Sequence, residues 1–322
     1  MNSDGVVIGP YKLLKQIGGG AAAIVYMAEQ VEPIRRKVAV KLLKPATATR
    51  QVVARFEAER QALALMDHPN IVRVFDGGST SWPSRVGDPV EEGAIRRLTP
   101  LGSPVLPYFV MELVDGAAIT DFCVQHRLPI RERLQLFIQL CRAVQHAHQK
   151  GIIHRDLKPS DILVTLHDVS NANLIERHDR ATAHVKLIDF GVAKALHPEL
   201  TNPAVFRGVF PLIGTPPYMS PEQAARNVNV DARSDIYSLG VLLYELLTGA
   251  TPNPDEGSST KLPPGELNSM VMKCTQTDPD RRYPTAEALA LDVQHFINDE
   301  PVSVHAMSTW NRIGKFVRRN WR

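Results

Sequence analysis

The sequence predicts an α+β protein of two lobes, a small β-rich lobe followed by a larger helical lobe. The first third of the chain alternates short runs rich in β-branched residues with glycine and proline. A single stretch of helical spacing interrupts these runs, whereas apolar patterns of helical spacing dominate from residue 118 onward. A length of 322 residues is sufficient for two lobes that share a cleft.

The first lobe is predicted to span about residues 11–112, after an N-terminal extension at 1–10. Val52, Phe56 and Leu63 recur at helical spacing and predict its main helix at 51–66. A stretch at about 79–107 is rich in Pro, Gly, Ser and Arg and is too long for a turn, so we expect a surface insertion. The expected strands are 11–17, 24–29, 38–43, 71–75 and 108–113.

The second lobe is predicted to span about residues 115–298. We expect glycine to close two of its helices, at Gly151 and Gly249. A polar stretch at about 166–184 is predicted to be a second insertion. The expected helices are 131–150, 231–247, 267–276 and 285–298, and a basic, aromatic tail follows at 299–322.

Composition excludes several classes of protein. A net charge of +3 is too small to indicate a nucleic-acid partner. Three cysteines (Cys123, Cys141 and Cys274) without CxxC spacing argue against a disulfide framework or zinc site and fit a reducing compartment. With neither a signal peptide nor an apolar run of about 18 residues, the chain is expected to be soluble and cytoplasmic.

Five segments carry chemistry, and their order is more specific than any one of them. A glycine-rich hairpin alone is usually a turn, and an isolated Asp-Phe-Gly occurs by chance. Phosphoryl transfer needs a phosphate cradle, a cation, acidic magnesium ligands and a carboxylate near the attacking hydroxyl. The segments are Ile-Gly-Gly-Gly-Ala-Ala-Ala-Ile-Val at 17–25, Val-Ala-Val-Lys at 38–41, His-Arg-Asp-Leu-Lys-Pro at 154–159, Asp-Phe-Gly at 189–191 and Gly-Thr-Pro-Pro-Tyr-Met-Ser-Pro-Glu at 214–222. Over about residues 11–298 the chain therefore resembles the bacterial Hanks-type, eukaryotic-like serine/threonine protein kinases and their bilobal fold.

The resemblance assigns catalytic roles. Asp156 would accept or orient the proton of the substrate hydroxyl, and Lys158 would stabilise charge on the transferred phosphoryl group. Thr215 would hydrogen-bond both of them. Lys41 would contact ATP and pair with Glu59; the competing Glu57 is turned away from the apolar face of the helix.

The resemblance also implies a nucleotide site. Met111 would lie behind the adenine pocket, and backbone groups of Glu112 and Val114 would bond the adenine. The predicted cofactor-binding residues are Ile17, Gly18, Gly20, Val25, Ala39, Lys41, Glu59, Met111, Glu112, Val114 and Leu163.

Asp189 and Asp161 are the predicted magnesium ligands, with Mn²⁺ as the alternative metal. The family pattern has asparagine five positions after the catalytic aspartate, where this chain has Asp161. A carboxylate binds magnesium at least as well as an amide does, but it adds negative charge beside ATP. Weaker nucleotide affinity or a changed metal preference is the expected consequence.

Three supporting features follow from the same resemblance. Glu222 is expected to pair with Arg282, and Asp235 to anchor the catalytic loop. Phe190 is expected to join an apolar column with His154, Leu63 and Val74.

His146 and His148 are two positions apart on a helix and so on different faces, which disfavours a metal site.

Two functional hypotheses remain. The first is transfer of the γ-phosphate of ATP-Mg to serine or threonine of a protein substrate. The alternative is a pseudokinase or weakly active nucleotide-binding scaffold, because Ala22, Ala23 and Asp161 depart from the family pattern.

The tail at 310–322 is either a juxtamembrane segment, which would make the chain the cytoplasmic domain of a membrane-anchored kinase, or it packs on the domain. No oligomeric state is predicted.

Thr201 is the only hydroxyl side chain between Phe190 and Gly214. The usual phosphorylation site would lie near Pro211, which is flanked by Phe210 and Leu212. We therefore predict that apolar packing orders this loop without a phosphate. Mass spectrometry after incubation with ATP and magnesium should find no dominant, activity-linked phosphate on Thr201, and finding one would contradict the prediction.

Overall fold

The computed structural model describes residues 6–20, 22–81, 105–167, 182–190, 216–225, 230–252, 262 and 264–304. These residues form two compact units, one made of the chain up to residue 67 together with 72–115, the other of 68–71 and the chain from 116 onward. Thr215, the loop with Thr201 and the basic tail from residue 305 onward lie outside the described residues.

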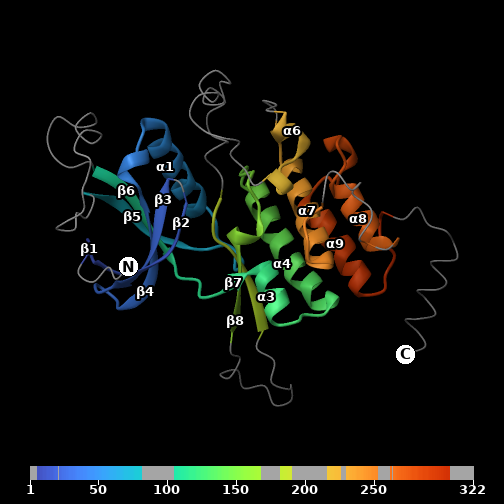
Figure 1. The fold of residues 1–322 in the computed structure, drawn as a ribbon, viewed down its shortest axis with the longest axis horizontal. Helices are drawn as coiled ribbons and strands as arrows, with labels where there is room; N and C mark the ends of the chain where they lie inside the picture. The colour runs from blue at the N-terminus through green and yellow to red at the C-terminus, as the bar shows by residue number, and fades with distance from the viewer. Residues whose placement is uncertain are drawn as a thin grey trace, which may run out of the picture. The chain divides into compact units, whose positions relative to one another are not determined.

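The first unit is an antiparallel sheet of six strands with a helix, α1, packed on it (Figure 1). The strand order is β1-β2-β3-β4-β6-β5. The elements are β1 (Val7–Ile8), β2 (Tyr11–Gly19), β3 (Ala23–Gln30), β4 (Arg36–Leu43), the short 3-10 helix η1 (Pro45–Thr47), α1 (Arg50–Ala64), β5 (Val74–Ser81) and β6 (Val105–Glu112).

Strand alternation separates the two faces of this sheet. On β4, Val38, Val40 and Leu42 point into an apolar core shared with strands β1, β2 and β6. Lys41 points to the opposite face, and its register partner is Phe109 on β6. Phe109 contacts Phe56 of α1 with ring centroids 5.1 Å apart, so the helix and Lys41 lie on the same face.

The second unit is mainly helical (Figure 1). Its small sheet has the order β7-β8-β9. The elements are β7 (Ala117–Ala118), α3 (Ile119–Gln125), α4 (Ile130–Gln149), η2 (Pro159–Asp161), β8 (Ile162–His167), β9 (Thr182–Leu187), η5 (Pro216–Tyr218), α6 (Pro221–Ala224), α7 (Arg233–Thr248), α8 (Glu266–Cys274), η7 (Pro279–Arg281) and α9 (Ala286–Ile297).

Helix α7 forms the centre of this unit. It is apolar on most sides and buries eleven residues, as expected of a helix surrounded by others. The predicted glycine ends are confirmed: Gly151 follows α4 with φ 73°, and Gly249 caps α7 with φ 80°. The three cysteines are free and buried.

Three predicted boundaries were wrong. The extension at 1–10 is not among them, although it contributes β1, whose Ile8 is buried in the sheet. The strand predicted at 71–75 begins at Val74, and Ile71 forms only an isolated bridge to Leu187. The first insertion is shorter than 79–107, because β5 runs to Ser81 and β6 begins at Val105. The second is shorter than 166–184, because β8 runs to His167 and β9 begins at Thr182.

Two glycines lie within β5, just before the predicted first insertion. Gly77 and Gly78 lie within β5 and not in a turn. A Cβ atom on Gly77 would lie 2.8 Å from Cδ of Arg60, and one on Gly78 would lie 3.0 Å from the hydroxyl of Tyr108. Because these glycines lack a Cβ atom, side chains from neighbouring elements can approach the strand closely at these positions.

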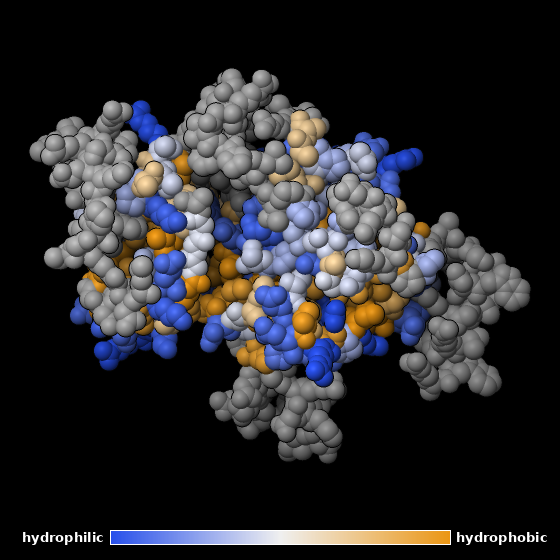
Figure 2. Space-filling view, viewed as in Figure 1, coloured by the Kyte–Doolittle hydropathy of each residue, from blue (hydrophilic) through white to orange (hydrophobic). Residues whose placement is uncertain are grey.

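The surface of the described residues has mixed polarity. Figure 2 shows apolar patches interspersed with polar residues over the helical unit. Single large apolar side chains are exposed on both units, for example Ile34 (70%) and Val124 (65%), which is ordinary for a globular domain. Among the residues that the structure describes, no helix combines the length and apolar content that a membrane span requires.

Candidate active site

Lys41 and Glu59 form a largely buried ion pair. The Lys41 Nζ lies 2.5 Å from Oε1 of Glu59, and each side chain is only 12% exposed. Nζ also lies 5.7 Å from the centroid of the Phe109 ring. Glu57 instead pairs with Arg60 on the same helix, so the structure selects Glu59. A lysine fixed in this way presents a positioned cation.

The glycine-rich hairpin joins β2 and β3. Gly18 and Gly19 pair with Val25 and Ile24, and the backbone N–H of Gly20 donates to the carbonyl of Ala23 at 2.9 Å. Ala23, which stands where the family has glycine, is buried in the sheet at 8% exposure. The hairpin is tied down by Lys44, whose Nζ donates to the carbonyl of Gly20 at 2.7 Å.

Four of the remaining predicted nucleotide residues of this unit lie on the neighbouring strands β3, β4 and β6, whereas Ile17 lies on β2 and Val114 follows the end of β6. Val25 pairs with Lys41, and Ala39 pairs with Met111. Ala39 and Met111 are buried, which leaves small and apolar side chains beside the lysine. The N–H of Glu112 donates to the carbonyl of Arg73 at 2.9 Å. Ile17 is 47% exposed.

The predicted catalytic loop, in the second unit, brings charged residues together. The Lys158 Nζ lies 2.8 Å from Oδ2 of Asp156 and 3.4 Å from Oδ2 of Asp161. Burial lowers the pKa of Lys158, but Asp161 and Asp156 more than offset this and raise it. Lys158 is therefore a cation held between two carboxylates.

Asp161 lies next to Asp189. The N–H of Ile188, the residue before Asp189, donates to the backbone carbonyl of Asp161 at 2.9 Å. Burial raises the pKa of the Asp161 carboxyl to about 6; Asp189 also raises it, while His154 and Lys158 lower it. Leu163, two residues after Asp161, lies on β8.

These carboxylates fit the donor set of a magnesium ion. Asp161 and Asp189 offer oxygen ligands, and magnesium is usually held by one or two carboxylates with substrate phosphates and water. Within the described ranges no group of three or more His, Cys, Asp or Glu side chains forms an all-protein metal site. A magnesium ion on this pair would need further ligands, such as phosphate oxygens and water.

Asp235 fixes the backbone of the catalytic loop from α7. This carboxylate, fully buried, accepts hydrogen bonds at 2.8 Å from the N–H groups of His154 and Arg155 and shares a third, also 2.8 Å, with Nε2 of His148. Burial raises its pKa, but the bond to His148 and the nearby charges leave it below its usual value. Sequence reasoning placed Asp235 here but missed His148.

Two further predicted contacts are present. Both guanidinium Nη atoms of Arg282 donate to Glu222, each at 2.7 Å. The buried ring of His154 packs on Phe190 with centroids 5.0 Å apart. Leu63 is buried in the first unit. These contacts are structural supports of the site.

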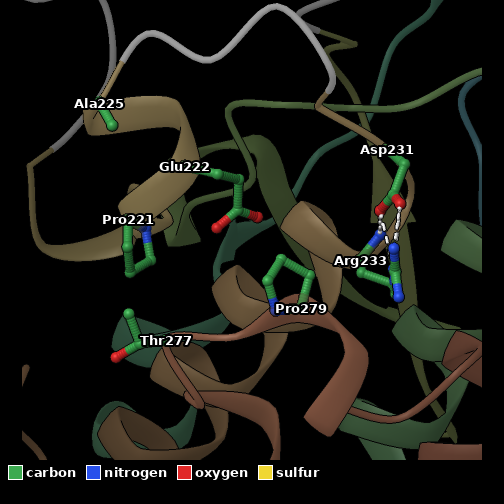
Figure 3. A pocket seen from close by; sticks show the side chains of 7 residues that line it. All are labelled: Pro221, Glu222, Ala225, Asp231, Arg233, Thr277 and Pro279. Atoms are coloured by element: carbon green, nitrogen blue, oxygen red, sulfur yellow. Dashed lines mark hydrogen bonds and ion pairs between the residues drawn. The ribbon is translucent and has the colours of Figure 1, made fainter.

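A surface cavity of about 340 Å³ lies beside α6. Figure 3 shows Asp231 and Arg233 paired at one side of it and Pro221 and Glu222 at another. None of the predicted nucleotide or metal residues lines it. We therefore locate the candidate active site by its charged residues and not by this cavity.

The chain matches the family model "Protein kinase domain" over residues 11–300. It is 33% identical over 310 residues to the serine/threonine-protein kinase PknB of Mycobacterium tuberculosis, covering 90% of this chain and 43% of the relative. It is also 33% identical over 302 residues to the serine/threonine-protein kinase Pkn1 of Myxococcus xanthus (88% and 38%). A probable serine/threonine-protein kinase PknB of Bifidobacterium longum matches over 309 residues at 33% identity (90% and 40%).

The chain belongs to the protein kinase domain family, and it resembles bacterial serine/threonine kinases of the Hanks type. The predicted family and bilobal α+β fold class are thereby confirmed. The chain spans about two-fifths of the length of the curated relatives that it matches.

The Asp161→Asn variant tests the departure at the metal site. It removes the negative charge that burial and Asp189 disfavour, and restores the residue of the family pattern. We expect a several-fold higher turnover or a relaxed preference between Mg²⁺ and Mn²⁺. Kinetic titrations with both metals would check this. A lower turnover with both metals would show that the carboxylate itself is required.

Proposed function

We propose that this domain transfers the γ-phosphate of ATP to serine or threonine hydroxyls of a protein substrate. The observation that carries the proposal is the cluster of Asp156, Lys158, Asp161 and the neighbouring Asp189 in one unit. The ion pair of Lys41 and Glu59 in the other unit supports it. Its relatives are named serine/threonine-protein kinases.

The proposed reaction assigns each group a task. Asp156 orients the substrate hydroxyl and accepts its proton as the oxygen bonds to the γ-phosphorus, and the bond to the β-phosphate oxygen breaks to release ADP. Lys158 stabilises charge on the transferred group. Asp161 and Asp189 would hold magnesium, which neutralises phosphate charge when bound. Lys41 would hold the phosphates, and Thr215 would bond the catalytic pair.

The experiment is an assay with γ-labelled ATP, first with magnesium and then with manganese, beside an Asp156→Asn control. Label incorporated by the wild type and lost in the control supports catalysis. Nucleotide binding by thermal shift with no label under either metal would overturn the proposal in favour of a scaffold. Phosphoamino-acid analysis should find phosphoserine or phosphothreonine, in agreement with the lysine at position 158.

We further propose a cytoplasmic site of action, with a protein substrate and ATP-Mg as partners and no nucleic acid. The charge and absence of cysteine motifs in the sequence support this. The tail at 310–322 combines arginine, lysine and tryptophan and would lie near a membrane surface. Vesicle sedimentation with and without anionic lipid would measure that association.

A further inference from the structure

Side chains hold the backbone of Arg155 on both its N–H and its carbonyl. The N–H donates to Oδ1 of Asp235 at 2.8 Å, and the carbonyl accepts a hydrogen bond from Nε2 of Gln223 at 2.7 Å. Arg155 has φ 66°, in the left-handed region that non-glycine residues seldom adopt. Such a conformation persists when surrounding contacts determine it. The carbonyl that Gln223 holds belongs to the peptide bond that leads into Asp156.

The hydrogen-bond network fixes the orientation of the Gln223 amide. Its Oε1 accepts from the N–H of Ser220 at 3.2 Å and from the Ser220 hydroxyl at 3.1 Å, which forms part of a capping box for α6. A reversed amide would place its NH₂ against the N–H of Ser220 and its oxygen against the carbonyl of Arg155. Gln223 therefore closes the helix cap with one atom and holds the catalytic loop with the other.

The helix that carries Gln223 is itself firmly held. Ser220 is fully buried, and Glu222 is paired with Arg282. Just before the helix, the hydroxyl of Ser238 on α7 donates to the carbonyl of Tyr218 at 2.8 Å. Because α6 is held in place, the hydrogen bond from Gln223 restrains the carbonyl of Arg155.

We propose that Gln223 is a positioning residue, which fixes the peptide bond before Asp156. It thereby couples the Ser-Pro-Glu segment at 220–222 to the orientation of the proposed catalytic carboxylate. This inference rests on the proposed function. The link ties residues 220–222, at the end of the 214–222 motif, to the residue expected to receive the proton of the substrate hydroxyl.

Gln223→Glu separates this role from that of the helix cap. Glutamate keeps the oxygen that accepts from Ser220 and is itself a preferred capping-box residue. It cannot donate from its other oxygen, which would face the carbonyl of Arg155. Gln276→Glu is the matched control, because the half-buried Gln276 also donates its amide to a backbone carbonyl, that of Met272 at 2.9 Å.

Steady-state kinetics with ATP-Mg and a mixed serine/threonine peptide library provide the first measurement. We expect Gln223→Glu to lower kcat about 10- to 100-fold while the KM for ATP stays within twofold, because the carboxylate is misplaced and the proposed nucleotide contacts are intact. For Gln276→Glu, both kcat and the KM for ATP should stay within twofold of the wild-type values. Unchanged kcat in Gln223→Glu, or an equal loss in both variants, would overturn the inference.

Hydrogen exchange of residues 154–161 in the nucleotide-free protein gives a readout independent of activity. Exchange should be faster in Gln223→Glu than in the wild type and unchanged in Gln276→Glu. If the wild type shows no turnover, the proposed function fails and the exchange result alone decides the coupling. If Gln223→Glu does not fold, Gln223→Met takes its place under the same criteria; equal exchange in wild type and variant would overturn the inference.

Discussion

Replacing Arg282 with alanine is expected to lower the free energy of unfolding by about 3–5 kcal/mol, because the change leaves the Glu222 carboxylate buried without its partner. The Arg282 side chain in the Glu222 ion pair is 0% exposed. The arginine also donates to the carbonyls of Gln276 and Arg233, each at 2.8 Å, and of Thr277 at 3.3 Å, so these three carbonyls lose their donor together with Glu222. Chemical denaturation followed by fluorescence would measure the loss.

Arg281→Ala is the matched control, because Arg281 is the preceding residue and is exposed. Its effect should stay within about 0.5 kcal/mol, as for ordinary surface substitutions. Equal midpoints for Arg282→Ala and the wild type would contradict the prediction. Arg282→Lys should recover only part of the loss, since lysine keeps the charge but cannot bond both carboxylate oxygens as a planar fork does.

The same pair predicts a pH dependence. Burial raises the pKa of Glu222, but the bonds from Arg282 outweigh it and hold the pKa below its usual value of 4.5. The unfolded chain therefore binds the proton first, and the stabilisation is lost as pH falls from about 4.5 through the lowered folded pKa. In Arg282→Ala the unpaired, buried carboxylate should have a raised pKa. The stability difference between wild type and variant should therefore shrink as pH falls, and a constant difference would contradict this origin.

Much of the site could be predicted from the sequence because its chemistry depends on local spacing. The positions of Asp156, Lys158 and Asp161 within one short segment make their proximity a consequence of chain geometry, whereas the role of Asp189 was predicted from the resemblance. The pairs Lys41–Glu59 and Glu222–Arg282 join distant segments, and they were predicted only because the whole motif order resembles a known family. Helix boundaries were predicted within a few residues, since amphipathic periodicity and terminal glycines mark them.

The remaining features depend on contacts between segments that are distant in the sequence. Gly77 and Gly78 look like turn residues in the sequence. The structure shows that a Cβ atom at these positions would meet the side chains of Arg60 and Tyr108, which are distant along the chain. His148 contacts Asp235 across two helices, and no spacing rule indicates that contact. Gln223 had a readable signal, because a serine three positions before glutamine is a capping-box pattern. Its second bond, to the carbonyl of Arg155, could not be inferred from that pattern.

Lys41→Met is expected to lower kcat by about 10²–10³-fold, the loss typical when one positioned group that stabilises transition-state charge is removed. The structural reason is that Glu59, at 2.5 Å, and the nearby Phe109 hold the ammonium group in one place. Methionine keeps the length and apolar packing of the side chain without its charge. The fold should therefore survive, although with lower stability because Glu59 loses its cation. A circular dichroism spectrum equal to that of the wild type would show that it does.

The matched control is Lys37→Met, on the same strand and at an exposed position opposite Glu29. It removes the same charge from the same strand, so it reports any effect of net charge or strand propensity alone. Glu59→Gln adds a second test, because it leaves the ammonium group in place but replaces its anionic partner with a neutral amide. A loss of kcat in Lys41→Met and a smaller loss in Glu59→Gln, with Lys37→Met unchanged, would show that both the cation and its placement contribute. Equal activity of Lys41→Met and Lys37→Met would instead mean that phosphoryl transfer does not use this lysine, and the assigned nucleotide site would be wrong.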